Sequence, residues 1–214
     1  MRWALALVLA LLSGTGFVYA VTDGFTALTA EAARRRQVAH EPRPVPDAML
    51  RTADGTAIRL REALRSDGRV AIVGFFYTRC VALCRAQGFI TQQLQAVIQA
   101  QGLASRIRLI SISFDLRERP PDLQRYGHDL QADAGLWQLG SFMRAPERDA
   151  LLRQFGIVVV PLQFGDFEHN AALHVVTPDG RLAGIFDLDE PGRALRMAQR
   201  MSANRRAPHV GERS

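Results

Sequence analysis

Apolar residues occur along this chain in two alternating ways, as short unbroken runs and as helical repeats. Residues 69–77 form a near-continuous apolar run flanked by polar residues, which is typical of a strand buried on both faces. Apolar residues between 90 and 98 then recur at helical spacing until Gly102 provides a stop signal. Residues 107–114 alternate and predict the next strand. The first half of the folded region is therefore expected to run strand, helix, strand.

The second half continues this alternation and then closes with a hairpin. The expected elements are a helix opened by Pro120 and Pro121, a short strand at 137–140, a helix at 147–155, a β-branched run at 157–160, a hairpin formed by 173–177 and 182–186, and a helix at 193–201. Strands that alternate with helices and end in a hairpin predict one three-layer α/β domain.

The N-terminal segment has a different pattern, because it is apolar without a polar face. Residues 3–21 are about as long as the roughly 20 residues that cross a bilayer as a helix. Small residues at Val18 and Ala20 also have the spacing of a signal-peptidase site, so a removed signal peptide is the alternative. Both interpretations of residues 1–21 predict that the rest of the chain is exported.

The remaining boundaries follow from shifts in composition. Residues 22–46 are polar, rich in Arg and then punctuated by Pro, which predicts a stalk that ends in a stiff extended piece. A turn signal at 53–55 predicts a hairpin, or a strand and turn, at the entry to the folded domain. The domain is expected to cover residues 47–203, followed by a polar tail at 204–214.

Composition and charge exclude some functions and leave others open. With 48% hydrophobic and 22% charged residues the chain is not intrinsically disordered. The formal net charge is +6, and all 27 basic residues are Arg. Only Arg34–Arg36 forms a run, so a compositional bias explains the excess better than a nucleic-acid site, although binding of nucleic acid or anionic lipid by this run is a weaker alternative.

The two cysteines carry the strongest chemical signal. Cys80 and Cys84 follow a buried strand and stand at the expected start of a helix. Residues four apart share a helix face, and a helix N-terminus favours the thiolate form. Two thiolates on one face suit Cu(I) or Zn, and the same pair can form a redox-active disulfide. A purely structural disulfide is the weaker alternative, because closing so short a loop stabilises little.

Histidines are the natural source of a further metal ligand. His169 follows Glu168 and precedes the hairpin strand expected beside the cysteine strand, which brings it within reach of the cysteine loop. His174 lies inside that strand, where a hydrogen-bonded and half-buried histidine is expected rather than a ligand. The other three stand among polar residues and are expected to be solvated: His40, His128 and His209.

Three motifs follow one another along the chain: Phe-Phe-Tyr-Thr-Arg-Cys-x-x-x-Cys at residues 75–84, Ser-Ile-Ser-Phe-Asp-Leu-Arg-Glu-Arg at 111–119, and Glu168-His169 before the turn at 178–180. In this order they resemble the Sco/SenC family of membrane-tethered copper chaperones. The resemblance extends from about Pro46 to Met201. It implies a thioredoxin-like domain with a mixed central sheet, preceded by one N-terminal transmembrane helix.

The resemblance also implies a ligand set, a cofactor and partners. Carried over by position, Cys80, Cys84 and His169 would bind one copper per chain, and Glu168 or Asp115 would orient the site. The expected acceptor is the copper A centre of cytochrome c oxidase subunit II, through copper delivery or cysteine reduction, or another copper-accepting protein. A copper donor chaperone is expected upstream. The expected location is the periplasmic side of a bacterial inner membrane, with no nucleic-acid partner.

An enzymatic alternative uses the same cysteines without metal. In an exported thiol-disulfide oxidoreductase, Cys80 would attack a partner disulfide and Cys84 would resolve the mixed disulfide. Such an enzyme does not need His169. Thioredoxin-type enzymes also place a cis-proline opposite the cysteines, whereas residues 170–172 are Asn-Ala-Ala. These two features favour the copper chaperone, with redox cycling of the cysteines as part of delivery.

Overall fold

The computed structural model describes residue 3, residues 26–80 and residues 83–204, with backbone only at residues 26–31, 83, 84 and 204. The expected anchor or signal at residues 1–21 lies outside this range apart from Trp3, and so does the tail from residue 205 onward. Among the helices of the described residues, none combines the length and the apolar character that crossing a bilayer requires.

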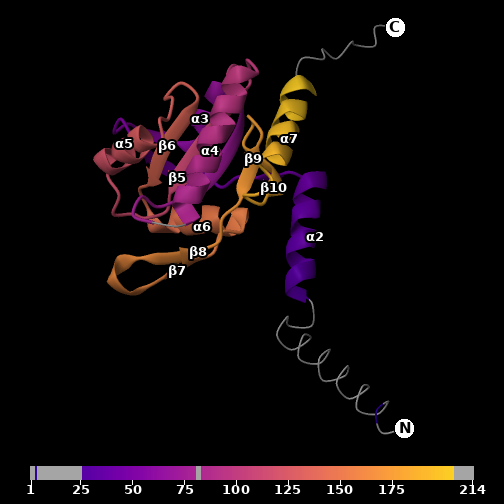
Figure 1. Cartoon of the computed structure of the whole chain (residues 1–214), viewed down its shortest axis with the longest axis horizontal. Helices are drawn as coiled ribbons and strands as arrows, with labels where there is room; N and C mark the ends of the chain where they lie inside the picture. The colour runs from indigo at the N-terminus through magenta and orange to yellow at the C-terminus, as the bar shows by residue number, and fades with distance from the viewer. Residues whose placement is uncertain (1–2, 4–25, 81–82, 205–214) are drawn as a thin grey trace.

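One eight-stranded mixed sheet forms the centre of the domain (Figure 1). Its strands are β1 (Arg43–Pro44), β2 (Met49–Thr52), β3 (Ala57–Arg59), β4 (Val70–Phe76), β5 (Ile107–Ser113), β6 (Trp137–Phe142), β9 (Leu173–Val176) and β10 (Arg181–Phe186). Their order in space is β1-β10-β9-β4-β5-β6-β2-β3. The central strands β4, β5 and β6 are parallel, and the pairs on either side are antiparallel. The expected mixed sheet is thereby confirmed, with β9 beside β4 as predicted.

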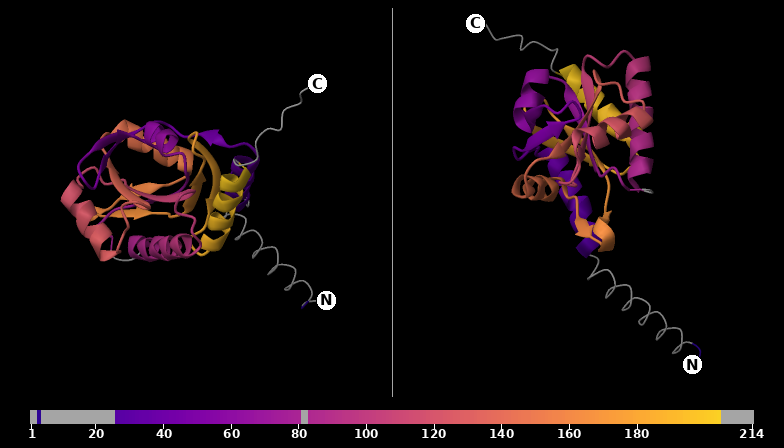
Figure 2. Two further views of the ribbon diagram at one scale, coloured as in Figure 1. Left: turned by 90° about the horizontal axis from the view of Figure 1, so that it is seen from above. Right: turned by 90° about the vertical axis from the view of Figure 1, so that its left-hand side faces the viewer.

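Helices cover both faces of this curled sheet (Figure 2). They are α2 (Thr26–His40), α3 (Leu60–Asp67), α4 (Leu83–Ala100), α5 (Pro120–Asp129), α6 (Ala145–Phe155) and α7 (Pro191–Asn204). Neighbouring residues of β4 show the two faces, since alternate side chains point to opposite sides of a sheet. Phe75 packs edge-on against Phe155 of α6, and Phe76 stacks on Tyr126 of α5.

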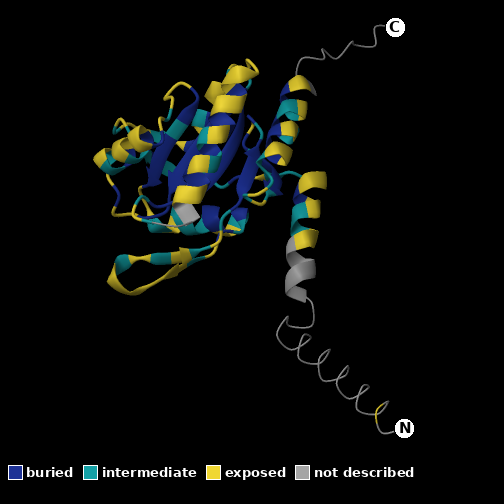
Figure 3. Cartoon of the chain, viewed as in Figure 1, coloured by how far each residue is buried: buried dark blue, intermediate teal, exposed yellow. Residues whose placement is uncertain are grey.

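The core lies along the two middle strands, β4 and β5. Every residue of both strands is buried (Figure 3). Strands covered by helices on both faces bury all of their side chains, which is why β4 is an unbroken apolar run in the sequence, whereas β5 also buries Arg108 and two serines. Each fully buried large aliphatic or aromatic side chain stabilises the fold by about 1.5–3 kcal/mol. The carboxyl ends of these strands are therefore held in a rigid frame.

Part of the segment expected as a stalk is built onto the domain. β1 pairs with the edge strand β10, and the Val45 N–H donates to the Gly180 carbonyl at 2.9 Å. Proline fits here because an edge strand leaves one side of its backbone without a partner strand. Val38 of α2 and Val45 are each only 1% exposed. Attachment to the sheet therefore begins well before residue 47.

Two elements differ from the expectation. α3 is a short amphipathic helix that buries Leu60 and Leu64 and ends at Gly68 in the left-handed conformation. Residues 163–168, for which the sequence predicted no strand, belong to a hairpin of β7 (Val159–Pro161) and β8 (Phe167–His169), joined through a single 3-10 turn. This β7–β8 hairpin forms a separate two-stranded sheet that projects from the domain (Figure 1).

Candidate metal and redox site

The cysteines stand where β4 turns into α4. The strand ends at Phe76, and the Cys80 N–H donates to the Tyr77 carbonyl at 3.4 Å. This hydrogen bond closes a turn over residues 77–80, called the cysteine turn below. Cys80 is half-buried and packs against the rim of the core. Cys84 lies in the first turn of α4, and its side chain is outside the described part of the chain. The structure thus places Cys84 in the first turn of a helix, where the backbone dipoles favour a thiolate, and Cys80 three residues before that helix begins.

His169 is brought to the same end of the sheet by the β7–β8 hairpin. Its ring lies edge-on to Phe114, with centroids 4.9 Å apart, and to Tyr77, with centroids 6.0 Å apart. Tyr77 precedes Cys80 by only three residues. The Tyr77 hydroxyl donates to the Phe167 carbonyl at 3.3 Å and accepts from the Phe167 N–H at 3.4 Å. Tyr77 therefore links the end of β4 to β8, the strand that carries His169.

The surroundings of His169 suit a neutral imidazole ligand. Burial lowers its pKa, and a hydrogen bond to the Asn170 carbonyl opposes this effect only in part. The Nδ1 atom lies 2.9 Å from that carbonyl oxygen, which accepts and so places the proton on Nδ1. The Nε2 atom then carries the lone pair. This is the tautomer and the kind of hydrogen bond that orient metal-binding histidines.

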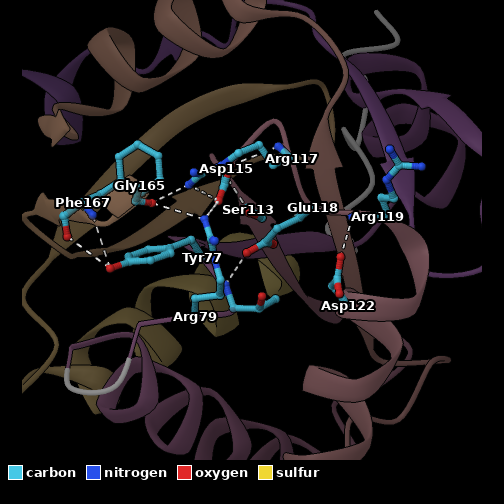
Figure 4. A network of polar contacts seen from close by, with 11 residues as sticks. Tyr77, Arg79, Ser113, Asp115, Arg117, Glu118, Arg119, Asp122, Gly165 and Phe167 are labelled. Atoms are coloured by element: carbon cyan, nitrogen blue, oxygen red, sulfur yellow. Dashed lines mark hydrogen bonds and ion pairs between the residues drawn. The ribbon is translucent and has the colours of Figure 1, made fainter. Parts of the chain in front are cut away.

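Asp115 is the centre of a charged network beside the cysteine turn (Figure 4). This buried carboxylate accepts from the Arg117 guanidinium at 2.8 Å through each oxygen, and from Arg79 at 3.0 Å. Burial raises the pKa of Asp115, but the Arg117 and Arg79 hydrogen bonds outweigh it, so the net pKa is below the ordinary value. Both guanidiniums also donate to the Gly165 carbonyl at the tip of the β7–β8 hairpin. The network therefore joins the cysteine turn, the end of β5 and the hairpin.

Gly165 is required at that tip for two reasons. Its φ of +79° lies in the left-handed region that favours glycine. A Cβ atom at this position would also lie 2.2 Å from a nitrogen of the Arg117 guanidinium. Glycine therefore permits both the turn and the close approach of Arg117.

A second carboxylate, that of Glu118, is hydrogen-bonded to the backbone of the cysteine turn. It is buried, and it accepts a hydrogen bond from the Thr78 N–H (Figure 4). Burial raises its pKa, while hydrogen bonds from Ser113 and Thr78 partly oppose the rise. Glu118 therefore fixes the backbone two residues before Cys80.

The other predicted site residues lie as follows. Glu168 is exposed on the outward face of β8, because adjacent residues of a strand point to opposite sides and His169 points inward. His174 is fully buried rather than half-buried, with its nitrogens 3.2 Å and 3.1 Å from two carbonyl oxygens. His40 and His128 are exposed as expected, and His209 lies outside the described residues. Among the residues with described side chains, which do not include Cys84, no three His, Cys, Asp or Glu gather as a ligand cluster.

Three contributors were not singled out from the sequence. Tyr77, Arg117 and Glu118 hold the cysteine turn and the hairpin in place. Only their position in the sequence could have indicated this role, because each follows the carboxyl end of a central parallel strand, where side chains from neighbouring strands meet. Which of them would pair with which could not be predicted, because the contacts involve the unexpected β7–β8 hairpin.

Comparison with known proteins identifies a family and a fold for this chain. The sequence profile of the SCO1/SenC family matches residues 52–203. No curated protein sequence matched the chain. Similar solved structures include BsSco, a member of the Sco family of cytochrome c oxidase assembly proteins with a disulfide switch, at 20% identity and a TM-score of 0.66, covering 76% of this chain and 95% of that one.

Two further similar structures contain copper. Bradyrhizobium japonicum ScoI with copper bound is 22% identical, with a TM-score of 0.60, and the match covers 74% of this chain and 99% of that chain. Arabidopsis thaliana ScoI with copper bound is 14% identical, with a TM-score of 0.61, covering 73% and 98%. At these identities the likeness shows the fold, and it confirms the thioredoxin-like architecture expected from the sequence.

Proposed function

The chain belongs to the SCO1/SenC family, and from this premise we propose that it is a membrane-tethered copper-binding chaperone with Cys80, Cys84 and His169 as ligands. The observation that carries the proposal is the placement of His169. Its imidazole lies against Tyr77, three residues before Cys80, and the hydrogen bond of Nδ1 to a carbonyl makes Nε2 the nitrogen that carries the lone pair.

The donor set fits copper in both oxidation states. Two soft thiolates are preferred ligands of Cu(I), and an added imidazole supports Cu(II). Each thiol releases its proton on binding, which the N-terminus of α4 assists. Asp115 would act indirectly, by holding Arg79 beside the cysteine turn and Arg117 against the hairpin. Glu168 is exposed, so it contributes to this site less directly than Asp115.

The proposed acceptor is cytochrome c oxidase subunit II or another protein with a copper-binding thiolate site. BsSco belongs to a family of oxidase assembly proteins, and two similar structures hold copper, which supports a role in copper delivery. Transfer would proceed by exchange of thiolate ligands between the two proteins. The proposed location is the outer face of a bacterial inner membrane, with residues 1–21 as the tether. Reduction of the acceptor's cysteines by the same thiols is the alternative activity.

Metal titration of the reduced full-length chain in detergent tests this proposal. One Cu(I) per chain is expected, and Cys80→Ser with Cys84→Ser should abolish it. Added Cu(II) should give an intense visible absorption from thiolate-to-copper charge transfer. His169→Ala is expected to weaken Cu(II) binding more than Cu(I) binding, and exposed His128→Ala serves as the control. Unchanged copper affinity in the double cysteine variant would refute the proposal.

A further inference from the structure

The β7–β8 hairpin has an apolar outer edge that no part of the described chain covers. Its exposed fractions are 63% for Val158, 48% for Val160, 50% for Leu162 and 97% for Phe164. The residues are spaced by two, so those on the extended backbone share one face. Contiguous exposed apolar residues of this kind mark a contact site on soluble domains.

Phe164 is the extreme member of this edge. Besides being almost fully exposed, it has a φ of +58°, in the left-handed region that non-glycine residues seldom adopt. The hydrogen bonds from Arg79 and Arg117 to the next carbonyl, that of Gly165, hold the tip in this shape. A large apolar side chain is thus presented outward at a conformational cost, which is common for residues with a binding role.

The hairpin tip and the start of α2 lie at the same end of the molecule. Figure 1 shows both at the lower end, and the right-hand view of Figure 2 shows the same arrangement from the side. The chain that precedes α2 includes the apolar residues 3–21. The chain therefore enters α2 at the end of the molecule towards which the hairpin projects.

From these observations we propose that the tip of the β7–β8 hairpin, Leu162 and Phe164, inserts into the surface of the lipid bilayer that holds the N-terminal segment. The inference rests on the tether proposed above. Arg79 and Arg117 are half-exposed behind the tip, at the level where guanidiniums pair with lipid phosphates. Asp166 and Glu168 are exposed carboxylates on the same hairpin, and Asp166 pairs with Leu162 across it, so the insertion is shallow and Phe164 reaches deepest.

Insertion would orient the candidate metal site. His169 ends the strand that leads away from the tip, and the cysteine turn lies beside it through Tyr77. With the tip in the bilayer surface, the site opens close to the membrane plane. A copper acceptor that is itself a membrane protein would then meet the site without passing over the far end of the domain.

Tryptophan quenching by brominated lipid tests the proposal. The two native tryptophans serve as internal references, one for the proposed tether and one for the protein core. Trp3 lies in the N-terminal apolar segment, and Trp137 is buried in the core. The full-length chain is reconstituted into vesicles of phosphatidylethanolamine and phosphatidylglycerol, with plain or brominated acyl chains. The variant Phe164→Trp is compared with Val97→Trp, a partly exposed position in the last turns of α4, at the opposite end from the cysteines.

The emission added by Phe164→Trp should be blue-shifted and lose about half its intensity in brominated vesicles, because the interface lies within reach of the acyl chains. The emission added by Val97→Trp should not change. Equal behaviour of the two variants overturns the proposal. So does a blue shift of Phe164→Trp in detergent that grows with protein concentration, since a second copy would then cover the tip. Lack of Trp3 quenching refutes the tether separately, whatever the hairpin does.

Discussion

His169 and His174 lie five residues apart on successive strands, yet their surroundings give them opposite chemistry. His169 is half-buried, and its Nδ1 atom donates to the Asn170 carbonyl, which puts the imidazole lone pair on Nε2. His174 is packed between Phe75 and Phe155, and each of its nitrogens faces a backbone carbonyl. The second histidine therefore contributes to stability and has no free nitrogen for a metal.

His174 predicts a loss of stability in mild acid. Burial lowers its pKa from 6.5 to about 4 in the folded chain. Below pH 6.5 the unfolded chain gains a proton that the folded chain does not, so the free energy of unfolding falls as the pH drops from 6.5 towards 4. The full loss is about 3 kcal/mol. Urea unfolding of the parent between pH 7.5 and 4.5 measures the slope.

The variants that check this origin are His174→Gln and His128→Gln. The first should lower stability at pH 7.5, because it disturbs the carbonyl contacts, and should flatten the acid slope. The second changes an exposed histidine and should leave the slope as it is in the parent. An unchanged slope in His174→Gln would assign the acid sensitivity to other groups.

Two substitutions of Glu118 are expected to differ in their effect on stability. Glu118→Gln keeps an oxygen that accepts from the Thr78 N–H, whereas Glu118→Ala leaves this N–H without its acceptor. Loss of a buried partner costs about 1–3 kcal/mol. Glu118→Ala should therefore be less stable than Glu118→Gln by that order in urea unfolding at neutral pH. Equal stability of the two variants would show that the hydrogen bond does not fix the cysteine turn.

The β7–β8 hairpin is the element on which the position of His169 depends. Its tip is held to the domain by Arg79 and Arg117 at the Gly165 carbonyl, and Arg117 also lies over the Phe167 ring, 5.3 Å from its centroid. These contacts reach the hairpin from loops that follow β4 and β5. A change in one of them is expected to move the imidazole while leaving the cysteines in place.

Arg117→Met tests this dependence. Methionine keeps much of the side-chain length but removes the hydrogen bonds to Asp115 and Gly165. Given the proposed ligand set, Cu(II) affinity should fall about tenfold, equivalent to about 1.4 kcal/mol, with a smaller change for Cu(I). Arg144→Met, which removes an exposed guanidinium paired with Glu147, is the control. Equal losses for both oxidation states would indicate that the cysteine turn had been disturbed instead.

Helices and strands whose apolar residues recur in a regular pattern were predictable from the sequence. Short elements that depend on contacts with distant parts of the chain were not. β4 was identified because burial on both faces leaves an unbroken apolar run, and β5 because its residues alternate. α3 was missed because it has only eight residues and two buried positions. β8 was missed because it is three residues long and pairs only with β7. For the same reason the sequence could place His169 near the cysteines but could not identify the contacts of Asp115 and Arg117 with the hairpin.

At the scale of the whole molecule, the two ends of the central sheet differ: one end carries the candidate site, and the other carries an ion pair that stabilises the sheet. The carboxyl ends of β4 and β5 carry the cysteine turn and Asp115. The amino ends carry a different charged group, in which Arg108 of β5 is almost fully buried and lies 3.1 Å from Asp67. Burial lowers the pKa of Arg108, and the charge of Asp67 opposes this effect. The amino-end group thus stabilises the sheet at a distance from the candidate site.

Asp67→Asn is therefore expected to destabilise the chain without changing its metal chemistry. The substitution leaves the buried Arg108 guanidinium without its counter-charge and weakens the hydrogen bonds of Arg69 to the same side chain. A loss of about 2–3 kcal/mol in the free energy of unfolding follows from removing one partner of a largely buried ion pair. Asp129→Asn changes an exposed carboxylate and should cost little. Copper stoichiometry and the Cu(II) absorption should match the parent in both variants at temperatures where they are folded. A weakened copper site in folded Asp67→Asn would mean that the two ends of the sheet are coupled through β4 and β5.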